Sequence, residues 1–284
     1  MSELVPVLLR FALYLDLMLL FGLGLFGLYA DSRLLNLKPQ LRALAALGLL
    51  LSVASLLSMT QSMSGAEDWP TLWTHLQMML WHTELGCTWW LRIAALVLVA
   101  LNTRLATWFG GIALVTLAWT GHGVMHEGSL GLWHLLSDSA HLLAAAGWVG
   151  ALAAFGLMLR STSEQAVPVL AHALAGFERV GAVFVAVLIG TGVANYLFVV
   201  GPNLNGITGG VYAILLCLKL GLFGLMLGLA AINRSHLTPL LQRSLAAGDH
   251  RAARKALRRS ITLEFGAVVL ILALVAWLGT LAPR

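Results

Sequence analysis

Long apolar runs separated by short polar loops are the feature of this sequence that most restricts its fold. Hydrophobic residues make up 60% of the 284-residue chain and charged residues 10%, whereas charged residues are usually about 25% of a soluble domain. A helix of about 20 apolar residues crosses a hydrocarbon layer about 30 Å thick, and no alternating ten-residue pattern of a β-barrel competes. We therefore predict an all-α fold, a polytopic membrane helical bundle.

About eight transmembrane helices are expected in this bundle, in a single domain over residues 1–284. The expected spans are 6–30, 41–63, 85–101, 105–121, 134–158, 174–200, 211–232 and 260–281. Between the second and third spans, tryptophans recur at helical spacing over 64–84, which predicts an amphipathic helix at the membrane interface. The basic stretch 233–259 predicts a second amphipathic helix, on the opposite side of the membrane.

Lysine and arginine residues indicate how the chain is oriented. They occur in the loops that follow the first, third, fifth and seventh spans, and they are missing from 64–84, 122–133 and 201–210. The positive-inside rule places these three loops and both termini outside the cytoplasm. We therefore expect a multi-pass protein of the bacterial inner membrane. The net charge of +5 comes largely from the basic loops that set this orientation, so nucleic acid is not an expected partner.

Histidines and sulfur-containing residues gather on the predicted periplasmic side. Six of the nine histidines fall there: His75, His82, His122, His126, His134 and His141. The sulfur-containing residues there are Met59, Met63, Met78, Met79, Met125 and Cys87. Imidazole suits copper and zinc, and thioether binds chiefly Cu(I), so copper is the first candidate ion. A single interfacial histidine more often bonds loop backbone, and methionine often fills apolar gaps. The gathering is therefore the signal, not any one residue.

The segment from Trp119 to Gly150 concentrates the candidate ligands. His134, Asp138 and His141 follow one another at i, i+4 and i+7, which places them on one helical face. At a rise of about 1.5 Å per residue the two histidines are about 10 Å apart, so they cannot share one ion without other residues. Either they belong to separate sites on an entry path, or Asp138 orients one of them. The predicted metal ligands are His122, His134, His141, His126, Met125 and His82.

Three charged residues are predicted to lie inside the membrane: Asp16, Arg92 and Lys219. A charge at the centre of a membrane helix costs at least about 2.5–3.5 kcal/mol, so such residues usually face a partner or a path. We expect Asp16 either to pair with Lys219 or Arg92, or to line a translocation path.

Several motifs carry a resemblance to a known family. They include Gly121-His122-Gly123, Trp133-His134-Leu-Leu-Ser-Asp138-Ser-Ala-His141, Phe177-Glu178-Arg179 and Leu218-Lys219. With these motifs the chain resembles the CopD/PcoD family of bacterial copper-resistance inner-membrane proteins. The resemblance implies eight spans and movement of copper from the periplasm toward the cytoplasm, with His122, His134 and His141 as ligands or relay points. It also implies a separate CopC-like periplasmic copper-binding protein as a partner.

Three functions remain open from the sequence. The first is a copper permease for Cu(I) or Cu(II), with no enzymatic activity and no catalytic residues, in which Asp16, Cys217 or Lys219 line or gate the route. The second is a b-type haem redox protein, which would use haem held by histidines on facing helices. The third is a copper-delivery factor for a respiratory oxidase.

Overall fold

The computed structural model describes residues 4–30, 36–120, 128–160, 166–202, 210–246 and 251–279. Over these residues the chain is helical and contains no strand, which confirms the predicted all-α fold. The α-helices are α1 (Leu4–Tyr29), α2 (Lys38–Ser64), α3 (Trp69–His82), α4 (Glu84–Leu101), α5 (Ala106–Val115), α6 (Gly128–Arg160), α7 (Ala166–Val199), α9 (Gly210–Ile232), α10 (Thr238–Ala246) and α11 (Arg251–Leu278).

Within the described residues, seven helices are long and apolar enough to cross a membrane: α1, α2, α4, α6, α7, α11 and the continuous helix that begins with α9. The expected span over 105–121 differs from these. Its α-helix α5 has only 10 residues, and 3₁₀ turns flank it as η1 (Thr103–Leu105) and η2 (Thr116–Thr120). A 3₁₀ turn rises about 2.0 Å per residue against 1.5 Å in an α-helix, so 103–120 still extends about 30 Å.

A buried arginine contributes to the irregular end of this segment. Arg92 of α4 donates from Nε to Thr116 Oγ1 at 2.7 Å and from Nη2 to the Thr116 carbonyl oxygen at 3.4 Å. The Thr116 hydroxyl in turn donates to the Ala113 carbonyl oxygen at 2.6 Å. These bonds satisfy the guanidinium without a carboxylate and fix the backbone where α5 gives way to η2.

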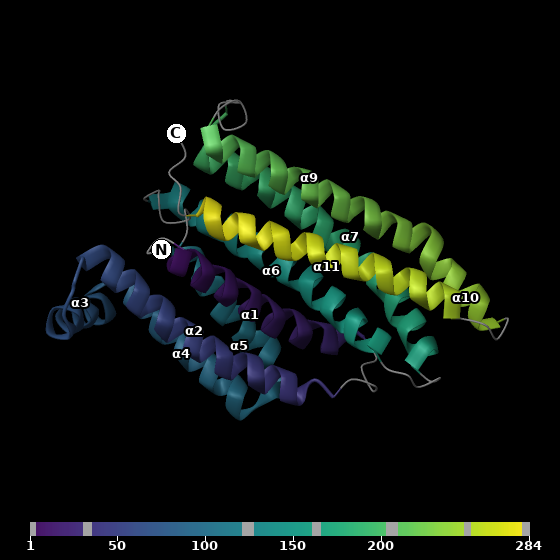
Figure 1. Ribbon diagram of the computed structural model, residues 1–284, viewed down its shortest axis with the longest axis horizontal. Coiled ribbons are helices and arrows are strands. Elements are labelled where there is room, and N and C mark those ends of the chain that lie inside the picture. Colours follow the sequence, from purple (N-terminus) through teal and green to yellow (C-terminus); the bar gives the residue numbers. More distant parts are fainter. Residues whose placement is uncertain are drawn as a thin grey trace.

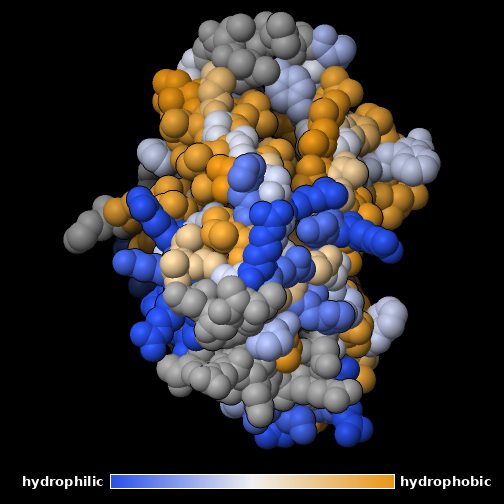
Figure 2. Space-filling model, turned by 90° about the vertical axis from the view of Figure 1, so that its right-hand side faces the viewer, coloured by the Kyte–Doolittle hydropathy of each residue, from blue (hydrophilic) through white to orange (hydrophobic). Residues whose placement is uncertain are grey.

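The two ends of the described chain lie at the same end of the bundle (Figure 1). Arg10 of α1 donates to the carbonyl oxygen of Gly279, just beyond α11, at 3.1 Å, and α3 lies at this end as well, which we call the α3 end. The opposite end, called the α10 end, carries many hydrophilic side chains (Figure 2). This arrangement fits the predicted topology. The expected result is that a reporter fused after Arg284 is active only in the periplasm; activity in the cytoplasm would contradict the assigned sides.

The helix predicted between the second and third spans is present as α3. Asp68 caps it by accepting the Thr71 N–H at 2.8 Å, and this bond holds the pKa of the Asp68 carboxyl below its usual range. Trp69, Trp73 and Trp81 are exposed, as expected of a helix whose tryptophans lie at an interface.

The expectation of one amphipathic helix over 233–259 is wrong. Helix α9 continues through a π-helical turn, η4 (Asn233–Leu237), into α10. The second half of the basic stretch instead begins α11. The reason is that Thr238–Ala246 extends the α9 span, whereas Arg251 and the residues after it open the returning span.

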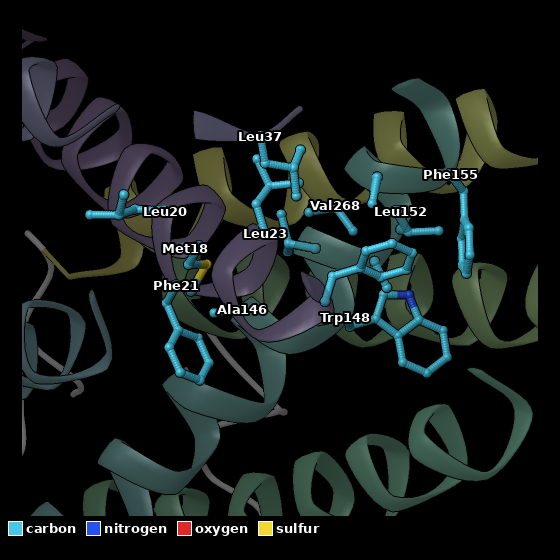
Figure 3. Packing of buried hydrophobic residues seen from close by; sticks show 14 of the residues in the cluster. Met18, Leu20, Phe21, Leu23, Leu37, Ala146, Trp148, Leu152, Phe155 and Val268 are labelled. Carbon is cyan, nitrogen blue, oxygen red and sulfur yellow. The ribbon is translucent and has the colours of Figure 1, made fainter. Parts of the chain in front are cut away.

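Helix α6 is the most buried of the long helices, and it crosses α1 at two glycines. A Cβ placed on Gly22 would lie 2.7 Å from Gly150 Cα, and a Cβ on Gly150 would overlap the Gly22 backbone. Small residues allow such close approach of membrane helices. Met18 and Phe21 of α1 and Ala146 of α6 belong to the core around this crossing (Figure 3). The crossing fixes the position of the α6 face that carries His134, Asp138 and His141.

Candidate functional site

His134, Asp138 and His141 all line one cavity of about 220 Å³ at the α3 end. The spacing of the three residues predicted a shared helical face, and the structure confirms it. Helices α1, α7, α9 and α11 form the other walls, which include Arg10, Asn195 and Lys219. We call this space the outer cavity. It brings polar residues of α1, α7 and α9 together around one face of α6.

His141 is oriented by a threonine on the neighbouring helix. Its Nδ1 lies 2.8 Å from Thr191 Oγ1, and the Thr191 hydroxyl donates to the Val187 carbonyl oxygen at 2.6 Å. Because that bond uses the only hydroxyl proton, Thr191 accepts from Nδ1–H, and the lone pair of the ring lies on Nε2. A neutral imidazole fixed in this tautomer is the arrangement found in metal-ligating histidines.

Asp138 is held from α7 and not by a histidine of its own helix. Asn195 donates from Nδ2 to Asp138 Oδ1 at 3.3 Å, and Asn195 Oδ1 is buried without a hydrogen-bond partner. Lys219 and Arg10 both interact electrostatically with the Asp138 carboxylate. Asp138 was predicted to orient one of the two histidines. In the structure, Thr191 orients His141 instead.

His134 is buried, with 2% of its surface exposed. Its ring stacks on Phe198 of α7, with ring centroids 4.9 Å apart and planes at 24°. It lines the outer cavity one turn before Asp138 and two turns before His141. The three residues thus lead from the α3 end toward the middle of α6.

A second cavity, of about 360 Å³, continues deeper between α6, α7, α9 and α11. It shares His141, Met18 and Lys219 with the outer cavity. Met226 and Trp148 line this deeper space but not the outer cavity, and we call it the inner cavity. Imidazole and thioether groups are therefore spaced along the two cavities, with His134 first, His141 and Met18 where they meet, and Met226 beyond.

Of the other predicted ligands, the structure describes only His82, and it does not join this group. His82 is exposed at the last residue of α3, a helix that packs against α2 and α4. His122, Met125 and His126 lie outside the described residues. Over the part of the chain that the structure describes, no three His, Cys, Asp or Glu side chains are close enough to hold one metal ion together. A bound ion would therefore need a thioether or further residues.

The expected ion pair of Asp16 is not formed. Both carboxylate oxygens of Asp16 are buried without a hydrogen-bond partner, and the carboxylate faces α2, where a Cβ on Gly48 would lie 2.7 Å from Oδ2. Lys219 lines the cavities on the α6 side of α1, and Arg92 bonds to Thr116. Arg92 and Lys219 therefore both point away from Asp16. The pairing predicted from their similar depth in the membrane is not formed for this reason.

The haem alternative requires two histidines on facing helices as axial ligands, and the described residues of this site do not include such a pair. Among the described residues that line the outer and inner cavities, the histidines are His134 and His141, and both lie on α6. Histidines on facing helices were the requirement of that alternative.

Five residues of the site were not identified from the sequence. They are Met18, Thr191, Asn195, Tyr196 and Met226. A methionine within an apolar span looks like a packing residue, so Met18 and Met226 give no signal without the fold. Thr191 and Asn195 are polar residues four apart in α7, and this spacing is the one sign in the sequence that α7 has a polar face.

Two family descriptions match the chain. "Copper resistance protein D-like, N-terminal domain" matches residues 1–132, and "Copper resistance protein D" matches residues 171–278. A copper resistance protein D from Pseudomonas syringae pv. tomato is 48% identical, with 100% of this chain and 98% of the relative covered. The chain belongs to the copper resistance protein D family. The prediction of a single domain over 1–284 stays a prediction.

Two further relatives of the chain are more distant. The inner membrane protein YebZ of Escherichia coli K12 is 28% identical, with 97% of each chain covered. The copper transport protein CutJ of Bacillus subtilis is 29% identical over 56% of this chain and 32% of its own length. No solved structure matches the chain. The family and the long apolar helices establish a multi-pass inner-membrane protein with a copper-related function.

Proposed function

We propose that this member of the copper resistance protein D family carries copper across the inner membrane, from the periplasm toward the cytoplasm, through the outer and inner cavities. The observation that carries the proposal is that His134, His141, Met18 and Met226 line two joined cavities in succession. A more distant relative, CutJ of Bacillus subtilis, is named a copper transport protein, and this supports the same function.

The donor types suit a copper ion that is passed from site to site. His134 and the Nε2 atom of His141 offer nitrogen ligands, and Met18 and Met226 offer thioether ligands, which bind chiefly Cu(I). Because these ligands are spaced along the path and are not gathered around one ion, few of them contact the ion at any one point. Each point therefore binds the ion weakly. Weak binding at several sites favours onward movement over storage.

The charges beside His141 complement this role. Lys219 lines both cavities and would repel a cation, and Asp138 offsets that charge. In the proposed path, Asp138 attracts copper into the outer cavity, and Lys219 lowers the affinity of the His141 position. The predicted ligand His122 and the predicted auxiliary ligands His126 and Met125 precede His134 in the sequence. A separate CopC-like protein would supply the ion.

Copper uptake by membrane vesicles tests the direction of transport. Right-side-out vesicles containing the protein are expected to accumulate externally added Cu(I) faster than vesicles without it, and everted vesicles are expected to show no such gain. The measurement is intravesicular copper against time. Faster accumulation in everted vesicles would reverse the proposed direction, and equal rates with and without the protein would contradict transport.

A further inference from the structure

A third cavity, whose mostly apolar lining includes several polar side chains, lies at the α10 end of the bundle. It has a volume of about 340 Å³, and its polar lining residues include Glu178, Asn233, Arg234, Thr238 and Glu264. None of its described lining residues is His, Cys or Met. The function proposed above uses none of these oxygen-bearing side chains, so the cavity requires its own explanation.

The π-helical turn η4 places Asn233 in this cavity. A π-helical turn is rare and often marks a functional site. Asn233 donates from Nδ2 to Glu264 Oε1, whereas its Oδ1 is buried without any hydrogen-bond partner. Asn233 is 9% exposed, so a nine-tenths buried oxygen in the wall of the cavity has an unused lone pair.

Glu264 is a buried carboxylate without a counterion. It is 2% exposed, and among the described residues no Lys, Arg or His nitrogen lies within 4.0 Å of it. The nearby Arg234 is paired with Glu178 instead, at 3.6 Å between Nε and Oε2. An unpaired carboxylate in the membrane is costly unless a bound cation or a proton neutralises it.

The ligand chemistry differs from that of the outer and inner cavities. Carboxylate, amide and hydroxyl oxygens suit hard cations, whereas imidazole and thioether suit copper. A single unpaired carboxylate is neutralised by one positive charge, and a divalent ion would leave a surplus charge buried in the protein. A monovalent alkali cation therefore fits both the ligand type and the charge.

We propose that Glu264 and Asn233 Oδ1, with Thr238 in the same wall, form a binding site for an alkali cation such as Na⁺. The Glu178–Arg234 pair marks the solvent side of this site, since its side chains are 35% and 64% exposed. Trp148 lines both this cavity and the inner cavity, so the indole separates the oxygen ligands from the copper ligands. The site does not depend on the proposed copper function.

Thermal unfolding of the purified protein tests the site. The midpoint is compared in NaCl, KCl and choline chloride at equal ionic strength and pH. An alkali cation at about ten times its Kd is expected to raise the midpoint by about 2–4 °C over choline. Glu264→Gln is expected to remove this rise, and Glu84→Gln, which removes an exposed carboxylate at the α3 end, is expected to keep it.

Asn233→Ala, which removes the free Oδ1, is a second variant for the case that Glu264→Gln cannot be purified. It is expected to lower the apparent affinity for the alkali cation at least about tenfold. Copper binding, measured on the same samples, is expected to stay as in the parent. Equal midpoints in all three salts would overturn the proposal, as would a rise that survives in both variants. A midpoint that responds to pH and not to the alkali cation would assign the site to a proton and would also overturn it.

Discussion

His141→Ala is expected to lower copper affinity at least about 10-fold, because it removes the Nε2 lone pair at the junction of the outer and inner cavities. Changes even to groups that only orient a ligand cost about 10–100-fold in metal affinity. Thr191→Val, which keeps the shape and removes the acceptor for Nδ1–H, is expected to weaken copper binding by a similar factor. The measurement is competition against a Cu(I) chelator with purified protein.

His172→Ala is the matched control for this change. His172 is an exposed residue of α7, near the opposite end of the bundle from the outer cavity. Its replacement is expected to leave copper affinity unchanged. Equal affinities for the parent, His141→Ala and Thr191→Val would remove His141 from the copper site and leave the hydrogen bond to Thr191 with a packing role only.

Gly150→Val is expected to cause the largest loss of stability of any single change considered. A Cβ at this position overlaps the backbone of Gly22 on α1, and no rotamer change relieves a clash with backbone. Overpacking costs about 1–3 kcal/mol or more, which corresponds to a fall of about 2–5 °C or more in the thermal unfolding midpoint. The measurement is the midpoint in detergent, and copper affinity is expected to fall with it, because the crossing positions His134 and His141.

Gly156→Ala tests whether the loss is specific to the crossing. Gly156 lies on the same helix, and nothing lies within 4 Å of a Cβ added there. Alanine is also about 1 kcal/mol better than glycine inside a helix, so this variant is expected to be as stable as the parent or more stable. A Gly150→Val protein that unfolds with the parent would show that α1 and α6 do not cross as described.

The sequence predicted the spans and the helical face of the site because both follow from local periodicity. The apolar runs gave the long helices, and the spacing of His134, Asp138 and His141 gave their common face. The expected span over 105–121 is instead a short α-helix with 3₁₀ turns at its ends. Local periodicity did not predict this, because the bonds from Arg92 to Thr116 join two different helical segments.

Partnerships between helices could not be predicted in the same way. Depth in the membrane suggested a partner for Asp16, but the direction in which a side chain points depends on helix rotation, and Gly48 is what faces Asp16. Met18 and Met226 became candidates only when two cavities joined them to His141. Glu264 lies near the start of the expected span over 260–281, where the sequence gives it no partner. The π-helical turn that brings Asn233 to it leaves no sign in the hydrophobic pattern.

Uptake of Cu(I) by proteoliposomes that contain the purified His134→Ala/His141→Ala double variant tests the central claim most directly. The variant must first be shown to insert and to unfold at the same temperature as the parent. Loss of both imidazole rings from the outer cavity is expected to reduce the initial rate of uptake at least about 10-fold relative to the parent. A double variant that takes up copper at the parent rate would contradict the claim that copper passes along this face of α6.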